Sequence, residues 1–163
     1  MSRSRFRKAE APAIVRDERG IAIMTEEYIL QACEYEGFYS FPQYNNTLYL
    51  HIKGFMKIEA LDNFINVRVL YLESNNIVRI ENLSCLKHLT LLYLQDNHLT
   101  KIENLDDNTE LSLINLSGNR IEVIENLDKL VKLHNFHISK NIIHTWKGLA
   151  GLKNCPSIAV VNI

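Results

Sequence analysis

The sequence has few of the features that mark a membrane protein, a secreted protein or a nucleic-acid-binding protein. Its longest uninterrupted apolar runs are only a few residues, whereas a membrane-spanning helix needs about 20. The basic residues at positions 3–8 are not followed by the apolar stretch of a signal peptide, so we expect an intracellular protein. Lys plus Arg number 18 and Asp plus Glu 19, giving a formal net charge of −1. This balance disfavours nucleic acid as a partner.

Residues that bind metals and phosphates are also sparse. Cys33, Cys85 and Cys155 lie far apart without a CxxC spacing, which favours neither a disulfide framework nor a zinc site. His134 and His137 are three positions apart on a predicted strand, so their side chains point to opposite faces. The glycines occur singly, with neither GxGxxG nor GxxxxGK, and no loop that cradles phosphate is predicted. We therefore expect no metal and no cofactor.

Leucine and asparagine, by contrast, are abundant, at 22 and 17 of the 163 residues. They recur with a fixed period: LYLESN, LYLQDN and INLSGN begin at Leu70, Leu92 and Ile114, a constant step of 22 residues. A fourth copy begins at Phe136 and a degenerate first copy at Leu48. The second half of each unit, IENL, keeps the same step. Such a period indicates internal structural repeats, and the spacing matches the leucine-rich repeat pattern LxxLxLxxNxL.

The spacing within one unit predicts its local structure. Alternate residues of a short strand point inward, so Leu70 and Leu72 are expected in the core. Ile77, Ile80 and Leu83 follow with a period of three, which suits short helical or 3₁₀ turns on the returning arm. The sequence therefore predicts a curved α/β solenoid, with a parallel sheet on the concave face and these turns on the convex face. Asparagines at one position per unit are expected to stack into a structural ladder that bonds to the backbone of the turns: Asn75, Asn97, Asn119 and Asn141.

The two ends of the solenoid are expected to differ. Thr25 is a predicted N-cap and Gly37 lies where a helix would end, so residues 24–44 are expected to form a helical amino-terminal cap. Residues 1–23 are expected to be a mobile tail. The repeat domain is assigned to 45–163, as five repeats plus the start of a sixth. The fifth unit is three residues longer than the others, and we expect a further repeat or cap to be missing after Ile163.

The outward strand positions are the candidate binding site. They stack three tyrosines in one column beside an apolar column, and exposed aromatic residues flanked by apolar ones are enriched in protein interfaces. Packing of neighbouring tyrosines on one sheet face is the alternative interpretation. The predicted partner-binding residues on the concave face are Tyr49, His51, Val69, Tyr71, Glu73, Leu91, Tyr93, Gln95, Leu113, Asn115 and His137.

Other functions are less well supported by the residues. Ser117, Ser139 and His137 are close on the predicted sheet but have no positioned acid, so a hydrolase is disfavoured. Binding of RNA, as in splicing proteins with repeats of similar length, is a minor alternative. We expect a non-enzymatic protein-binding module that acts as a monomer, without a membrane or nucleic-acid partner.

The repeats with their IENL signature resemble the intracellular subclass of leucine-rich repeats found in the regulatory subunit of protein phosphatase one and in axonemal proteins. The run NTLYLHIKGF, which begins at Asn46, and the helix before it resemble the start of the repeats in the dynein axonemal assembly factor one family. This resemblance covers roughly residues 24–163. It implies a cytoplasmic factor for preassembly of axonemal dynein arms in motile cilia or flagella. The implied partners are axonemal dynein chains or assembly co-chaperones, or alternatively a phosphatase catalytic subunit.

Overall fold

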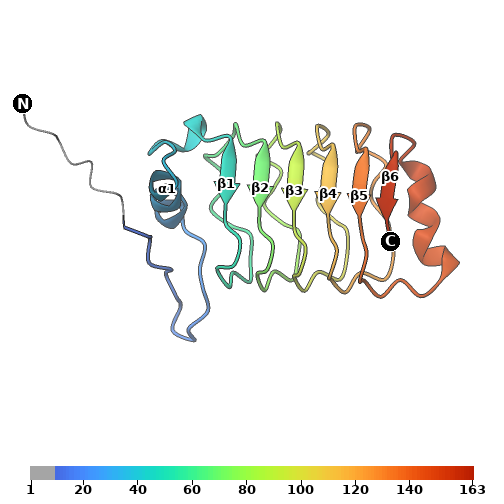
Figure 1. The fold of residues 1–163 in the computed structure, drawn as a ribbon, viewed down its shortest axis with the longest axis horizontal. Coiled ribbons are helices and arrows are strands. Elements are labelled where there is room, and N and C mark those ends of the chain that lie inside the picture. Colours follow the sequence, from blue (N-terminus) through green and yellow to red (C-terminus); the bar gives the residue numbers. More distant parts are fainter. Residues whose placement is uncertain (1–9) are drawn as a thin grey trace, which may run out of the picture.

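The structure is a computed structural model and describes residues 10–163. The chain forms a single coil whose short strands lie side by side. Each turn of the coil contributes one strand to a parallel sheet in the order β1-β2-β3-β4-β5-β6 (Figure 1). The strands are β1 (Thr47–Tyr49), β2 (Val69–Tyr71), β3 (Leu91–Tyr93), β4 (Leu113–Asn115), β5 (Asn135–His137) and β6 (Val160–Asn162).

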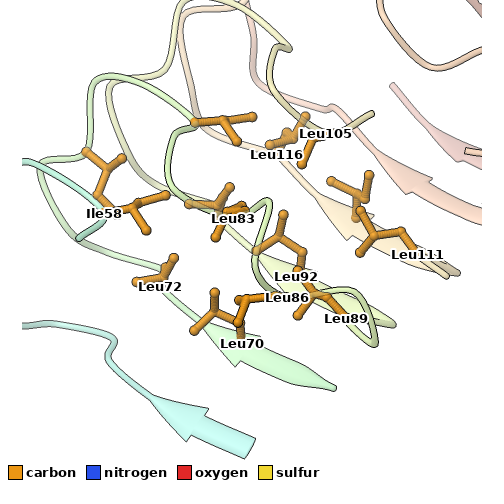
Figure 2. Packing of buried hydrophobic residues seen from close by; sticks show 14 of the residues in the cluster. Ile58, Leu70, Leu72, Leu83, Leu86, Leu89, Leu92, Leu105, Leu111 and Leu116 are labelled. Carbon is orange, nitrogen blue, oxygen red and sulfur yellow. The ribbon is translucent and has the colours of Figure 1, made fainter. Parts of the chain in front are cut away.

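The register of the strands follows the sequence period. Leu48 pairs with Leu70, and Leu70 with Leu92, so equivalent side chains of successive repeats lie above one another. These inward residues are buried, together with the apolar residues of the returning arms (Figure 2). Because each repeat packs on its neighbours, the core is one continuous cluster along the solenoid. The predicted parallel-sheet solenoid is confirmed.

The returning arms are held by single turns of 3₁₀ type. In the second repeat, the N–H of Leu86 donates to the carbonyl of Leu83, and the N–H of Leu89 donates to the carbonyl of Leu86. The three-residue spacing therefore corresponds to bonded turns over the stretch from Leu83 to Leu89. The fifth arm differs because it contains a longer 3₁₀ helix, η2 (Trp146–Asn154). Its extra length shows in the register, where Phe136 pairs with Val161.

The first strand is covered by helix α1 (Glu26–Tyr35), which lies beside β1 in Figure 1. The hydroxyl of Thr25 accepts a hydrogen bond from the N–H of Tyr28 at 3.1 Å, which caps the helix start. Gly37 has a left-handed φ of 85°, a conformation that favours glycine just past a helix end. The buried side of the helix closes the apolar end of the coil, and a short 3₁₀ helix, η1 (Pro42–Tyr44), leads into β1.

The segment before the helix differs from the tail expected over residues 1–23. Residues 15–23 form a tight turn, in which Asp17 bonds to the backbone of Ile21. Ala22, which is 5% exposed, forms a parallel bridge to Phe55 of the first repeat. The apolar run that ends at Met24 is therefore partly buried against the solenoid, because its backbone and side chains contact the first repeat. Residues 1–9 of the expected tail lie outside the described part of the chain.

Candidate functional site

The open face of the sheet carries the predicted partner-binding residues. Because side chains alternate along each strand, the central residue of a strand is buried and the flanking ones reach the surface. The parallel register then places Tyr49 opposite Tyr71, and Tyr71 opposite Tyr93. We call the outward side chains of β1–β5 and of the residues two positions beyond each strand the open sheet face.

Three tyrosines on this face form a regular stack. The rings of Tyr49 and Tyr71 have centroids 4.9 Å apart with planes 12° from parallel, and those of Tyr71 and Tyr93 are 4.7 Å apart at 5°. These spacings equal the distance between neighbouring strands, so the sheet itself sets the ring separation. Burial, together with the neighbouring phenols, raises the pKa of Tyr71. A phenol is protonated at neutral pH even at its ordinary pKa, so the shift extends the range over which the Tyr71 hydroxyl can donate a hydrogen bond into more alkaline solution.

The stack continues beyond the strands into the amino-terminal cap. The ring of Phe38, in the loop after α1, lies 6.0 Å from the ring of Tyr49 with the planes 17° apart. Sequence reasoning missed Phe38 because its position depends on the path of the chain after Gly37 and not on the repeat period. The sequence did offer one signal for Phe38. It is an aromatic residue directly after the predicted end of the cap helix, and the cap was expected to cover the first strand.

The columns beside the stack are apolar on one side and polar on the other. Val69, Leu91 and Leu113 are half-buried and pair in register along one side. The polar column is made of His51, Glu73, Gln95, Ser117 and Ser139.

Several polar atoms of the polar column have no hydrogen-bond partner. The Nδ1 atom of His51 lies 4.0 Å from a carboxylate oxygen of Glu73, beyond hydrogen-bond reach. Within the described residues, His51 Nδ1, Glu73 Oε2 and Gln95 Oε1 are shielded and have no hydrogen-bond partner. Shielded polar atoms without a partner carry a desolvation cost.

The aromatic character ends at the fourth strand. Asn115 replaces tyrosine there, and its side-chain oxygen accepts a hydrogen bond from the N–H of Ser117. His137 follows in register on β5. The hydroxyl of Ser139 donates to that of Ser117 at 3.1 Å. The open sheet face is thus aromatic over β1–β3 and, apart from Leu113, polar over β4 and β5.

The asparagines at the end of each strand join successive repeats. The side-chain oxygen of Asn97 accepts a hydrogen bond from the N–H of Ile77, and its amide nitrogen donates to the carbonyls of Leu72 and Leu94. The same set of contacts recurs, with its partners shifted by one repeat, at Asn75, Asn119 and Asn141. Backbone groups of each turn are therefore satisfied by a side chain from the repeat that follows.

A second row of asparagines runs along the opposite arm. Asn82, Asn104 and Asn126, from the IENL segments, each donate a 2.7 Å hydrogen bond to a carbonyl of the preceding repeat. All three have φ near 57°, in the left-handed region that asparagine tolerates better than most residues. The sequence showed that this asparagine recurs every 22 residues, but it did not predict that the side chain bonds to the preceding repeat. Ala60 occupies the same place in the first repeat, at φ 58°.

The described residues contain no group of three or more His, Cys, Asp and Glu side chains that could hold a metal ion. The Nδ1 atom of His134 lies 2.6 Å from the carbonyl oxygen of Lys132, and His137 lies on β5. Among the helices of residues 10–163, none has the length and apolar character needed to cross a bilayer.

Comparison with known proteins gives a family model and several relatives. Residues 65–107 match the family model described as leucine rich repeats in two copies. The chain is 44% identical over 55 residues to dynein axonemal assembly factor 1 of Peromyscus polionotus, a match that covers 34% of this chain and 9% of the relative. It is 37% identical over 49 residues to the leucine-rich repeat-containing protein ODA7 of Chlamydomonas reinhardtii, over 30% of this chain and 11% of that protein.

Among solved structures, the Drosophila melanogaster SNF/U2A′ complex has a chain that aligns with a TM-score of 0.68 at 23% identity, over 85% of this chain and 82% of the other. At this identity the likeness concerns the fold. The matches to the curated relatives span about a tenth of their length. The protein is therefore a leucine-rich repeat solenoid, and about a third of its sequence is similar to dynein axonemal assembly factors.

Proposed function

We propose that this chain is the recognition part of a non-enzymatic factor that preassembles axonemal dynein arms in the cytoplasm for motile cilia or flagella. The similarity to dynein axonemal assembly factor 1 carries this proposal. The relative from Chlamydomonas reinhardtii is a second leucine-rich repeat protein that matches at a comparable level. The leucine-rich repeat fold supports recognition of a protein as the role of this chain.

The open sheet face is the proposed binding surface. Tyr49, Tyr71 and Tyr93 present rigid rings beside half-buried apolar side chains. Ordering such rings costs little entropy on binding, because stacking already fixes them. A dynein chain or an assembly co-chaperone is the proposed partner.

The test is affinity capture of the tagged chain from ciliated cells, with mass spectrometry of the retained proteins. The comparison variant is the double substitution Tyr71→Ala and Tyr93→Ala. Trp146→Ala is the matched control because Trp146 is an aromatic residue 89% exposed on η2, away from the tyrosine stack. Circular dichroism establishes that each variant is folded.

We expect the wild-type chain and the Trp146→Ala control to retain dynein chains or co-chaperones, and the double variant to lose them. Retention of the same proteins by the folded double variant would reject the open sheet face as the binding surface. Capture of a phosphatase catalytic subunit without dynein would instead place the chain with phosphatase regulators.

A further inference from the structure

Three aromatic side chains in the loop between α1 and β1 are strongly exposed. Tyr39, Phe41 and Tyr44 are 60%, 58% and 60% exposed. The ring of Tyr44 lies 5.9 Å from each of the other two, at steep angles of 68° and 73°. We call these three residues the aromatic lip. Clustered exposed rings of this kind are typical of surfaces that another molecule covers.

The backbone that carries the aromatic lip is fixed by hydrogen bonds from the buried side chain of Asn45. Asn45, which is 2% exposed, accepts a hydrogen bond from the N–H of Tyr39 through its side-chain oxygen. Its amide nitrogen donates to the carbonyls of Tyr39 and Phe41. The exposed rings therefore project from a backbone fixed by a buried side chain. A fixed backbone lowers the entropic cost of binding.

Phe38 connects the chain segment of the aromatic lip to the tyrosine stack. Phe38 precedes the lip in the chain and stacks on Tyr49, the first ring of the stack. Phe38 is itself 38% exposed and Tyr49 36%. A partner that covers Tyr49 would thus also reach Phe38, the residue before the lip.

The charged residues near this surface are mostly acidic, although Arg68 donates a backbone hydrogen bond to Asn46, two residues after Tyr44. No lysine or arginine occurs between Arg19 and Lys53, whereas Glu34 and Glu36 lie in this stretch, close to the lip in the chain. The outward positions of β1–β5 likewise carry no lysine or arginine, and Glu73 is their acidic residue. A complementary partner supplies positive charge.

We propose that the aromatic lip, together with the tyrosine stack, binds an arginine-bearing segment of the protein partner. The inference rests on the proposed protein-binding function and extends the surface to the amino-terminal cap. A guanidinium group is planar and weakly hydrated, so it stacks on exposed aromatic rings and still pairs with carboxylates. Lysine fits less well, because its compact ammonium group is strongly hydrated.

The test begins with a displayed library of random 12-residue peptides selected on the full chain. Selected peptides are then measured by isothermal titration against wild type, the lip variant Tyr39→Ala with Phe41→Ala, and the stack variant Tyr71→Ala with Tyr93→Ala. Trp146→Ala is again the control for loss of an exposed aromatic residue. Each arginine in a selected peptide is replaced by citrulline, which keeps the shape and removes the charge, and in a second series by lysine, which keeps the charge.

We expect arginine in the selected peptides, and a loss of affinity of about tenfold both on citrulline replacement and in the lip variant. We also expect citrulline replacement to have little further effect in the lip variant, because both changes remove the same contact. Peptides without arginine, equal binding of the citrulline forms, or equal binding of lysine forms would overturn the inference. So would full affinity in the lip variant.

The two proposals fail in different ways. Peptides that bind the lip variant normally but lose affinity for the stack variant would leave the open sheet face as a binding surface and reject the lip. Peptides that bind both variants like wild type would reject both surfaces.

Discussion

The side chain of Asn97 accepts a 3.0 Å hydrogen bond from the backbone N–H of Ile77, a residue of the preceding repeat. The same amide group donates to two carbonyl oxygens. One buried side chain therefore satisfies three backbone groups that belong to two turns of the coil. These groups are buried, since Ile77, Leu72 and Leu94 are each 0% exposed and Asn97 is 3% exposed.

Replacing Asn97 by alanine should lower the free energy of unfolding by about 2–4 kcal/mol, because buried backbone groups are left without partners. Chemical denaturation followed by circular dichroism measures the change. Asn76→Ala is the control: Asn76 is exposed and makes a single long contact of 3.4 Å. A change at Asn97 as small as the one at Asn76 would contradict this role of the ladder.

Ile52 is a second position, and here the backbone conformation determines how a substitution changes stability. It has a left-handed φ of 55° and is 71% exposed, so a β-branched side chain there is strained without gaining burial. Ile52→Asn should raise the free energy of unfolding by about 1 kcal/mol, since asparagine tolerates this region. The measurement is again denaturant unfolding.

The comparison variant for this test is Ile65→Asn. Ile65 is 50% exposed and does not have a positive φ. It should show no gain in stability. If the two variants shifted stability alike, the effect would come from lost apolar surface and not from the backbone.

The thiol of Cys33 provides a test of the cap. Burial, with a smaller contribution from Glu34, raises the pKa of Cys33 from its ordinary value of 9.0 to about 11. At pH 8 only roughly one thiol in a thousand is then ionised, so iodoacetamide should leave Cys33 unmodified in the folded protein. Mass spectrometry of peptides reports the labelling at each cysteine, and labelling in denaturant supplies the reference.

The raised pKa also sets a pH dependence. A neutral buried thiol contributes its full stability below pH 9, and the contribution is lost as the pH rises through about 11. Alkaline solution should therefore loosen the cap and expose Cys33 to the reagent. Rapid labelling of Cys33 already at pH 8 would show that α1 does not stay packed on β1.

The repeat period accounts for most of the fold. A fixed step combined with the alternation of a strand determines which leucines are buried, and therefore places Leu48, Leu70 and Leu92 in one layer. The same arithmetic places the three tyrosines in one column. The spacing and stacking of their rings then follow from the distance between strands.

Features outside the period could not be derived in this way. The turn over residues 15–23 packs on Phe55 through a backbone bridge, and no spacing in the sequence predicts that contact. Phe38 and the aromatic lip lie in a loop whose path depends on Gly37 and on the side chain of Asn45. The place of Phe38 beside the tyrosine stack is a tertiary result. The binding role of the open sheet face stays a prediction.

The asparagine ladder gives the solenoid a direction. Each side chain reaches back to the repeat before it, so the turn of one repeat is complete only when the next repeat is folded. Loss of structure at Asn141 would leave the backbone N–H of Ile121 without a partner. The turn that contains Asn119 and Ile121 would then be less stable. Local opening from the carboxyl-terminal side is thereby penalised repeat by repeat. The chain should accordingly unfold in one cooperative step and not by gradual fraying.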